Sequence, residues 1–267
     1  MEITQKRGVP GSVLKWIAVV SMLIDHTAAS LLFCAIRFNG AYGPGILSRN
    51  FYQALRIIGR PAFPIFCFLL VEGYFHTRSR GKYLLRLGLF ALISELPYDL
   101  SLRRMWMVIG TPEAQGLARF GLETGSQNVY FTLFFGLLAV LLWDRLTKGN
   151  APDCPAWRGL AAVLCAVGLG AAAYYMRTDY KAMGVALILT MYLLRDRPWA
   201  RDLAAGGVLA AMIPFGSSWI ELLAVSAFPL LHLYSGQRGR QSKYFFYLFY
   251  PGHLLLLALL AKLIFRL

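Results

Sequence analysis

Long apolar runs recur along almost the whole chain, and they leave few segments that could form the polar surface of a soluble domain. Hydrophobic residues make up 58% of the 267 residues and charged residues only 15%, whereas about a quarter of the residues of a soluble domain are charged. A helix that crosses a membrane needs about 20 mostly apolar residues. Because the runs do not alternate with a period of two, helices are favoured over the strands of a barrel. The sequence therefore predicts an all-α membrane bundle of about nine helices, within a range of eight to ten.

The apolar runs also place the expected helices. No repeat and no second hydrophobic core is visible, so we expect a single transmembrane domain over residues 1–267. The first run lacks a small-residue cleavage site and is expected to be retained as a helix. The shorter runs could be tilted, re-entrant or buried in the bundle. The expected segments are Leu14–Ile36, Pro61–His76, Tyr83–Asp99, Asn128–Arg145, Gly159–Met176, Tyr180–Leu194, Leu203–Pro214, Ser218–Tyr234 and Tyr244–Phe265.

The net charge of +14 comes from Lys and Arg clusters between the apolar runs. This is the pattern of cytoplasmic loops, so no nucleic-acid partner is expected. The larger share of the basic residues falls on one side if the amino terminus lies in the cytoplasm, as the positive-inside rule requires. The four cysteines lie far apart and show no metal-binding spacing, so neither a disulfide framework nor a metal site is expected.

Asp25 and His26 lie in the middle of the first expected helix, about 15 Å beyond Lys15 at 1.5 Å per residue. Ionisable groups at this depth are costly unless they are paired or line a wet cavity, so both are candidates for function. A stripe of small residues shares the face of Asp25 and predicts that this face packs against protein. Histidine moves protons near neutral pH, but adjacent helical residues diverge by about 100°, so direct pairing is not assured. The alternative is a structural polar pair.

The last expected helix contains Tyr250, Pro251 and His253. Pro251 leaves the carbonyl of Tyr247 without its helical donor, and the resulting kink can place His253 beside a cavity. A packing kink with a satisfied histidine is the alternative.

Arg60 precedes a proline-containing helix entrance, Pro61–Pro64. It is predicted to bind a carboxylate or to stabilise negative charge. The alternative is an interfacial arginine whose head group reaches water.

Polar residues near the ends of the expected helices are candidates for binding the acceptor substrate, although each could instead cap a helix. Glu72 closes the apolar stretch that follows Arg60, and the others lie near expected outward ends. The substrate-binding candidates are Glu72, Glu95, Asp99, Asn128, Asp179 and Tyr180.

Short motifs spread over most of the chain carry a resemblance to a known family. They are Lys15–Ala18, Met22–His26, Gly59–Phe68, Glu72–Tyr74, His76–Thr77, Lys82–Tyr83, Arg86–Leu87, Ser94–Asp99, Gln127–Val129, Thr178–Tyr180, Tyr244–Tyr247 and Tyr250–His253. In sequence and in order they resemble the TraX family of membrane acetyltransferases, named for the protein that acetylates the amino terminus of conjugative F-pilin. The resemblance implies an enzyme of a bacterial cytoplasmic membrane that takes acetyl-CoA from the cytosol and acetylates an amine or hydroxyl acceptor.

Under this resemblance His26 is expected to act as general base or transient acetyl carrier, with Asp25 setting its basicity and orientation. Arg60, Tyr250 and His253 are expected to stabilise the oxyanion, position the thioester or donate to the thiolate. The CoA phosphates are expected on basic residues of the cytoplasmic side, for which topology alone is the alternative. The candidates for CoA binding are Lys15, Arg78, Arg80, Lys82, Tyr83, Arg86, Arg238 and Lys243.

The expected partners are the lipid bilayer, acetyl-CoA and an acceptor that the sequence does not identify, and a homo-oligomer is a possible assembly. A rival interpretation is a proton-coupled transporter in which Asp25, His26, Glu72 and His253 form a relay. A third is a non-catalytic assembly factor in which the polar residues only hold helices together.

Overall fold

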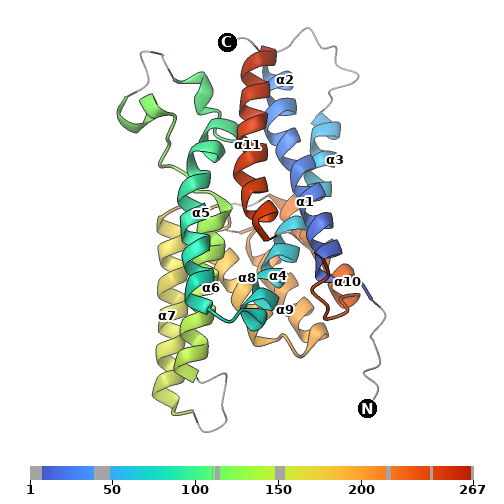
Figure 1. Ribbon diagram of the computed structural model, residues 1–267, viewed down its shortest axis with the longest axis vertical. Coiled ribbons are helices and arrows are strands. Elements are labelled where there is room, and N and C mark those ends of the chain that lie inside the picture. Colours follow the sequence, from blue (N-terminus) through green and yellow to red (C-terminus); the bar gives the residue numbers. More distant parts are fainter. Residues whose placement is uncertain are drawn as a thin grey trace. The chain divides into compact units, whose positions relative to one another are not determined.

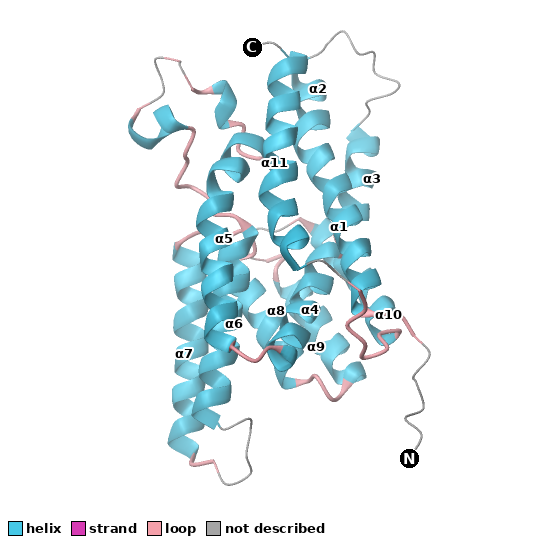
Figure 2. Ribbon diagram, in the orientation of Figure 1, coloured by secondary structure: helices cyan, strands magenta, loops and turns pink. Residues whose placement is uncertain are grey.

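The structure is a computed structural model that describes residues 8–38, 49–109, 111, 115–147, 154–214, 218–240 and 243–265. These residues form helices joined by loops and turns, and within them no strand is present (Figure 2). The two isolated bridges, Val9 with Tyr234 and Gln127 with Thr178, do not extend into a sheet. The predicted all-α class is confirmed.

The helices include α-helical, 3-10 and π segments. In chain order they are α1 (Gly11–Thr27), the π-helix η1 (Ala28–Leu32), α2 (Phe33–Phe38), α3 (Arg49–Gly59), α4 (Ala62–His76), α5 (Arg80–Ser101), the 3-10 helices η2 (Met105–Met107) and η3 (Gly116–Phe120), α6 (Val129–Thr147), α7 (Ala156–Tyr175), α8 (Lys181–Leu193), α9 (Pro198–Ala211), the 3-10 helix η4 (Trp219–Ser226), α10 (Ala227–His232) and α11 (Lys243–Phe265).

Each segment that the apolar runs predicted coincides with helix in the structure. Among the described residues, three helical segments lie outside the expected runs, namely α3, η2 and η3. Helix α3 lies between the expected segments Leu14–Ile36 and Pro61–His76, and it was missed because it is amphipathic and too short to register as an apolar run. The expected segment Ser218–Tyr234 is a 3-10 helix followed by the short α10, not one α-helix.

Five helical stretches are long and apolar enough, by length and composition, to cross a membrane. Two shorter apolar helices, Lys181–Leu193 and Trp219–His232, accompany them. With the all-helical architecture, these stretches identify an integral membrane protein. The long stretches are Gly11–Arg37, Arg49–His76, Val129–Thr147, Ala156–Tyr175 and Tyr244–Phe265.

The helices group into two compact units. Unit 1 contains Met1–Leu69, Leu96–Glu123 and Ser218–Leu267, and unit 2 contains Leu70–Glu95 and Thr124–Ser217. The chain passes from one unit to the other within α4 and again within α5.

In unit 1, α1 and α11 run side by side in the same direction (Figure 1). Near their beginnings, Trp16 packs against Phe245 with ring centroids 5.2 Å apart. Near their ends, Cys34 and Ala261 share a buried cluster with Trp106.

The small-residue face of α1 packs inward as predicted. Ala18, Ser21, Asp25 and Ala28 are all buried. Directly after this face the helix widens into the π turn η1, which contacts α3 and α11. Such turns occur mostly as single insertions in α-helices and often lie at functional sites.

Unit 2 is built on α6, α7 and α8, which pack around a cluster of Ala139, Ala173 and Val185 (Figure 1). Gly136 lies so close to Ile188 that a side chain there would collide with it, which allows α6 and α8 to approach closely. Helix α9 packs on α8.

Candidate functional site

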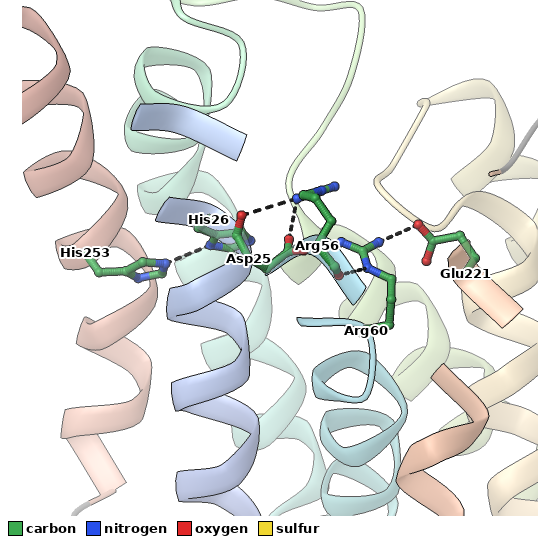
Figure 3. Close-up of polar contacts among 6 residues, drawn as sticks. All are labelled: Asp25, His26, Arg56, Arg60, Glu221 and His253. Atoms are coloured by element: carbon green, nitrogen blue, oxygen red, sulfur yellow. Dashed lines mark hydrogen bonds and ion pairs between the residues drawn. The ribbon is translucent and has the colours of Figure 1, made fainter. Parts of the chain in front are cut away.

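Two histidines from different helices form a hydrogen bond inside unit 1. Nδ1 of His26 on α1 and Nε2 of His253 on α11 lie 2.8 Å apart, and the rings are nearly parallel (Figure 3). His253 is buried, and His26 is half-buried. The sequence separation of 227 residues is closed by the packing of α1 on α11.

The partners of His253 determine which nitrogen carries each proton. Nδ1 of His253 lies 2.7 Å from the carbonyl oxygen of Phe249, which can only accept, so this nitrogen carries the hydrogen. In the neutral ring Nε2 of His253 is therefore an acceptor, and Nδ1 of His26 donates to it. The lone pair of His26 is left on Nε2, which makes no hydrogen bond to any other described residue. His26 thus carries an oriented, available basic nitrogen.

Helix α11 fixes His253 from its own preceding turn. The ring stacks on Phe249 with centroids 4.6 Å apart, and the edge of Tyr250 packs against both histidines. Pro251 lies inside the helix, which continues to Phe265 without unwinding. The predicted alternative, a histidine satisfied by a nearby carbonyl, therefore describes one nitrogen of His253 correctly, while the other nitrogen binds His26.

Asp25 points away from the histidines and binds two arginines. Nη1 of Arg56 donates to Oδ2 of Asp25 at 2.5 Å, and Nη2 of Arg60 donates to Oδ1 at 2.5 Å. Asp25 is 6% exposed, so these ion pairs offset the cost of burying its charge. The sequence predicted that Asp25 orients His26, but in the structure that contact comes from His253, because adjacent helical residues diverge by about 100°.

Arg60 continues the network to η4. Its other terminal nitrogen, Nη1, donates to Glu221, and its Nε donates to the backbone oxygen of Arg56 at 3.0 Å. Arg56, Asp25, Arg60 and Glu221 thus form a ladder of alternating charges, which we call the ion ladder (Figure 3). The predicted carboxylate partner of Arg60 is present, and the arginine is buried and not interfacial.

A glycine makes room for the ion ladder. A Cβ atom at Gly59, the last residue of α3, would collide with the side chain of Asp25. Gly59 also stands between Arg56 and Arg60, which lie one helical turn apart and so face Asp25 together. The turn at Arg60–Pro61 then separates α3 from α4, as the proline motif predicted.

The site contains two residues that the sequence analysis missed, Arg56 and Glu221, and a third, Gly59, that it quoted only as part of a motif. The signal for Arg56 was its spacing of four residues from Arg60, which places both on one helical face once α3 is recognised. No local pattern pointed to Glu221, because its partner is 161 residues away.

Glu72 lies in unit 2 and is bound to Arg195, whose Nε donates to Oε1 at 2.7 Å. Beside it, Asp144 accepts hydrogen bonds from Tyr74 and Tyr192 at 2.8 Å each and an ion pair from Arg80 at 2.5 Å; we call this the Asp144 cluster. Both carboxylates lie at one end of α6, which is the predicted cytoplasmic end. Glu72 is therefore separated from the outward candidates Glu95 and Asn128 by the length of α6.

The outward candidates are mostly engaged in local structure. Asn128 caps α6 by accepting from the backbone of Tyr130, and its amide donates to Glu95 and to the carbonyl of Ala91. Asp99, in unit 1, accepts from the backbone nitrogen of Glu123 at 2.8 Å. Asp179 is exposed, and the backbone nitrogen of Tyr180 lies 3.4 Å from the hydroxyl of Thr132. Capping, the alternative that the sequence left open, holds for Asn128.

The CoA candidates divide between the units. In unit 2, Arg80 is paired with Asp144, Arg86 faces the ring of Tyr83, and Arg78 and Lys82 are exposed. In unit 1, Lys15 lies over Phe246 and close enough to Arg238 for their charges to interact. The side chain of Lys243 lies outside the described residues.

Comparison with known proteins identifies the family of the chain. The family model described as TraX protein matches residues 10–261, which includes every residue of the histidine pair and the ion ladder. The chain belongs to the TraX family. A curated relative of this TraX chain, named probable fimbrial assembly protein FimC, serogroup H1, from Dichelobacter nodosus, is 34% identical over 258 residues, which are 91% of the chain and 92% of the relative. No solved structure matches this TraX chain.

Proposed function

We propose that this protein is an integral-membrane acetyltransferase of a bacterial cytoplasmic membrane, which transfers the acetyl group of acetyl-CoA to an amine or hydroxyl. The observation that supports this most directly is the available Nε2 of His26, held as a base by the hydrogen bond from His26 to His253. Membership of the TraX family supports the reaction class.

In the proposed reaction, Nε2 of His26 takes the proton of the acceptor N–H or O–H while the acceptor atom attacks the thioester carbon. The carbon–sulfur bond then breaks, and the sulfur leaves as thiolate. The proton on Nε2 passes to that thiolate, so the products are the acetylated acceptor and free CoA, and His26 is neutral again. General-base catalysis of this kind contributes about 10²–10⁴-fold in rate.

His253 acts as a positioning residue in this scheme. Its Nδ1–H faces a carbonyl oxygen, which does not take up a proton, so a proton on His26 is not relayed further along α11. The hydrogen bond to His253 instead keeps Nε2 of His26 as the reactive nitrogen and stabilises the imidazolium when it forms. With both nitrogens engaged, His253 does not donate to the substrate, which leaves Arg60 and Tyr250 as the proposed oxyanion partners.

Unit 1 offers a place for the CoA phosphates at the beginning of α1. Lys15 and Arg238 bring two like charges together there, an arrangement that an anion stabilises. Lys15 precedes His26 by about 16 Å along the helix. An extended pantetheine arm can span this distance, which supports a donor that enters from the predicted cytoplasmic side.

The acceptor is proposed to be a protein amino terminus. The name of the curated relative connects that protein with fimbrial assembly, and the resemblance that names the family concerns acetylation of a pilin. A fimbrial subunit is therefore the first acceptor to test.

The ion ladder weakens the transporter interpretation. A proton relay would need carboxylates that exchange protons, but Asp25 is bound by two arginines and Glu72 by one. Carboxylates held in this way are structural ion pairs and not open members of a relay chain.

The test is calorimetric binding of acetyl-CoA to detergent-purified protein, followed by transfer of labelled acetyl to a pilin-derived peptide. We expect saturable binding that the double variant Lys15→Glu and Arg238→Glu weakens at least about tenfold, as expected for losing two charge-assisted contacts. Arg158→Glu, which makes half of this charge change at one residue of unit 2, is the control. If the wild-type protein does not bind acetyl-CoA, the proposal is wrong, and flux assays in proteoliposomes would then test the transporter.

A further inference from the structure

Arg104 adopts a backbone conformation that arginine rarely takes. It follows the end of α5 with φ 60° and ψ 32°, in the left-handed region where glycine or asparagine usually stands. A side chain in this region is strained, and strained positions concentrate where a particular orientation is needed. The strain directs attention to what the Arg104 side chain contacts.

The guanidinium of Arg104 packs against α2 but has no acidic partner there. Its Cζ lies 4.2 Å from the ring centroid of Phe33. Within the described part of unit 1, the guanidinium forms no hydrogen bond and no ion pair. Burial is the main cause that lowers the pKa of Arg104, and the like charges of Arg103 and Arg37 lower it further. Cys34 and Tyr52 act in the opposite direction. The neighbouring Glu123 forms an ion pair with Arg103 and not with Arg104.

A second donor without a partner lies two residues away. Trp106 is 7% exposed, and its Nε1–H finds no acceptor among the described residues. A buried donor of this kind costs free energy unless a ligand or water accepts from it. Trp106 packs on Cys34, the neighbour of Phe33, so the indole and the guanidinium flank the same turn of α2. Both unmatched groups are donors and one of them is a cation, so an anion with several oxygen atoms would satisfy both.

The position of Arg104 corresponds to the membrane surface. Phe33 lies about 33 Å along α1, η1 and α2 from Gly11, at 1.5 Å per residue. The hydrocarbon core of a bilayer is about 30 Å thick. Arg104 is thus placed at the far end of the two parallel spanning helices, where phospholipid headgroups lie.

We propose that Arg104, with Arg37 nearby and the indole N–H of Trp106, binds the phosphate group of a phospholipid at the predicted outer surface. The planar guanidinium donates to the phosphate oxygens, as arginine does elsewhere. Its stacking on Phe33 fixes the orientation of the donors.

The experiment uses the delipidated full-length protein in a neutral detergent, with thermal unfolding as the measurement. We expect short-chain phosphatidylglycerol to raise Tm in a saturable way, as a ligand of the folded state does. A diacylglycerol with the same chains but no phosphate should not raise it. Arg104→Gln should weaken the apparent affinity for phosphatidylglycerol at least about tenfold, and Trp106→Phe by a smaller factor.

Arg177→Gln is the matched control, because Arg177 is also left-handed, with φ 54°, and carries the same charge. A second variant, Arg104→Gly, separates binding from folding: it relieves the strained backbone and should raise Tm without lipid while abolishing the lipid response. The proposal fails if Arg104→Gln and Arg104→Gly respond to phosphatidylglycerol like the wild type. If inorganic phosphate alone gives the full Tm shift, the site binds free phosphate and the lipid assignment is wrong.

Discussion

Two polar clusters, one in each unit, differ in how completely their hydrogen-bonding groups are satisfied. In the Asp144 cluster, one carboxylate receives donors from Arg80, Tyr74 and Tyr192, so both of its oxygens are engaged. In unit 1, the histidine pair ends in a nitrogen of His26 that has no partner among the described residues. The two clusters therefore differ in use. The Asp144 cluster joins helix ends, whereas the histidine pair leaves the lone pair of His26 Nε2 available.

The clusters also differ in their place along the helices. Asp144 lies in the last turn of α6, where it is partly exposed. Its ion pair with Arg80 joins α6 to α5, and hydrogen bonds from Tyr74 and Tyr192 join it to α4 and α8. Asp25 lies within α1, where the ion ladder must neutralise each charge inside the protein. The variants below test whether this difference separates reactivity from support.

The largest effect is expected for His26→Ala. Removing the proposed base should lower acetyl transfer about 10²–10⁴-fold. Tm should change little, because His26 is only half-buried and its partner His253 keeps its bond to Phe249. Transfer of labelled acetyl by purified protein is the measurement, and His232→Ala, an exposed histidine of the same unit, is the control. Near-wild-type turnover would remove His26 from catalysis.

The next effect concerns stability. Asp25→Asn leaves two arginines without their shared carboxylate, and removing one partner of a buried ion pair costs about 3–5 kcal/mol. Gly59→Ala should be destabilising at the same place, since its Cβ would collide with Asp25. Gly168→Ala, where nothing lies within 4 Å, is the matched control. Thermal unfolding in detergent measures all three, and unchanged Tm in both ladder variants would contradict the buried ion ladder.

A smaller effect on rate is expected at His253. His253→Phe removes the acceptor for Nδ1 of His26 and should lower acetyl transfer about 10- to 100-fold, the loss seen when an outer hydrogen-bond partner of a histidine is removed. His253→Asn should retain more activity, because its side-chain oxygen can accept the same hydrogen bond. Nitrogen-15 NMR of the His26 ring distinguishes positioning from packing: the tautomer should become mixed in the Phe variant. An unchanged tautomer would refute the positioning role.

The smallest effect is expected for Asp144→Asn. Tyr74 and Tyr192 donate to different oxygens of Asp144, so one hydroxyl can still donate to the amide oxygen while the other accepts from the amide NH2. The main loss is then the partly exposed pair with Arg80, at about 1 kcal/mol or less. Acetyl transfer per folded molecule should stay at the wild-type level. A collapse of transfer at unchanged Tm would show that the Asp144 cluster participates in the reaction, and the contrast drawn between the two units would be lost.

Much of the fold follows from the sequence, because lipid imposes long apolar helices and leaves few alternatives. Leu14–Ile36 and Tyr244–Phe265 were predicted nearly at their observed ends. Helix α3 was not, since its amphipathic pattern lies below the length of a spanning run. The π turn also left no signal, as its sequence, AASLL, suits an ordinary helix.

The sequence predicted which residues belong to the candidate site, but not which of them bind one another. His26, Asp25, Arg60, Tyr250 and His253 were all singled out, and the structure brings them together in unit 1. Their pairings depend on helix rotation and on contacts more than 200 residues apart, which periodicity does not determine. The catalytic roles remain predictions until the variants are measured.

The π turn at Ala28–Leu32 has a consequence for the history of the first helix. A π turn holds one residue more than the α turn it replaces, so it records a single-residue insertion. Deleting that residue would restore an α turn and would leave both flanking segments in register, so Phe33 would still face Arg104 and His26 would keep its place. Relatives with a first helix one residue shorter are therefore expected to keep both the histidine pair and an arginine at position 104, so the length of this turn can vary without moving either end of the helix.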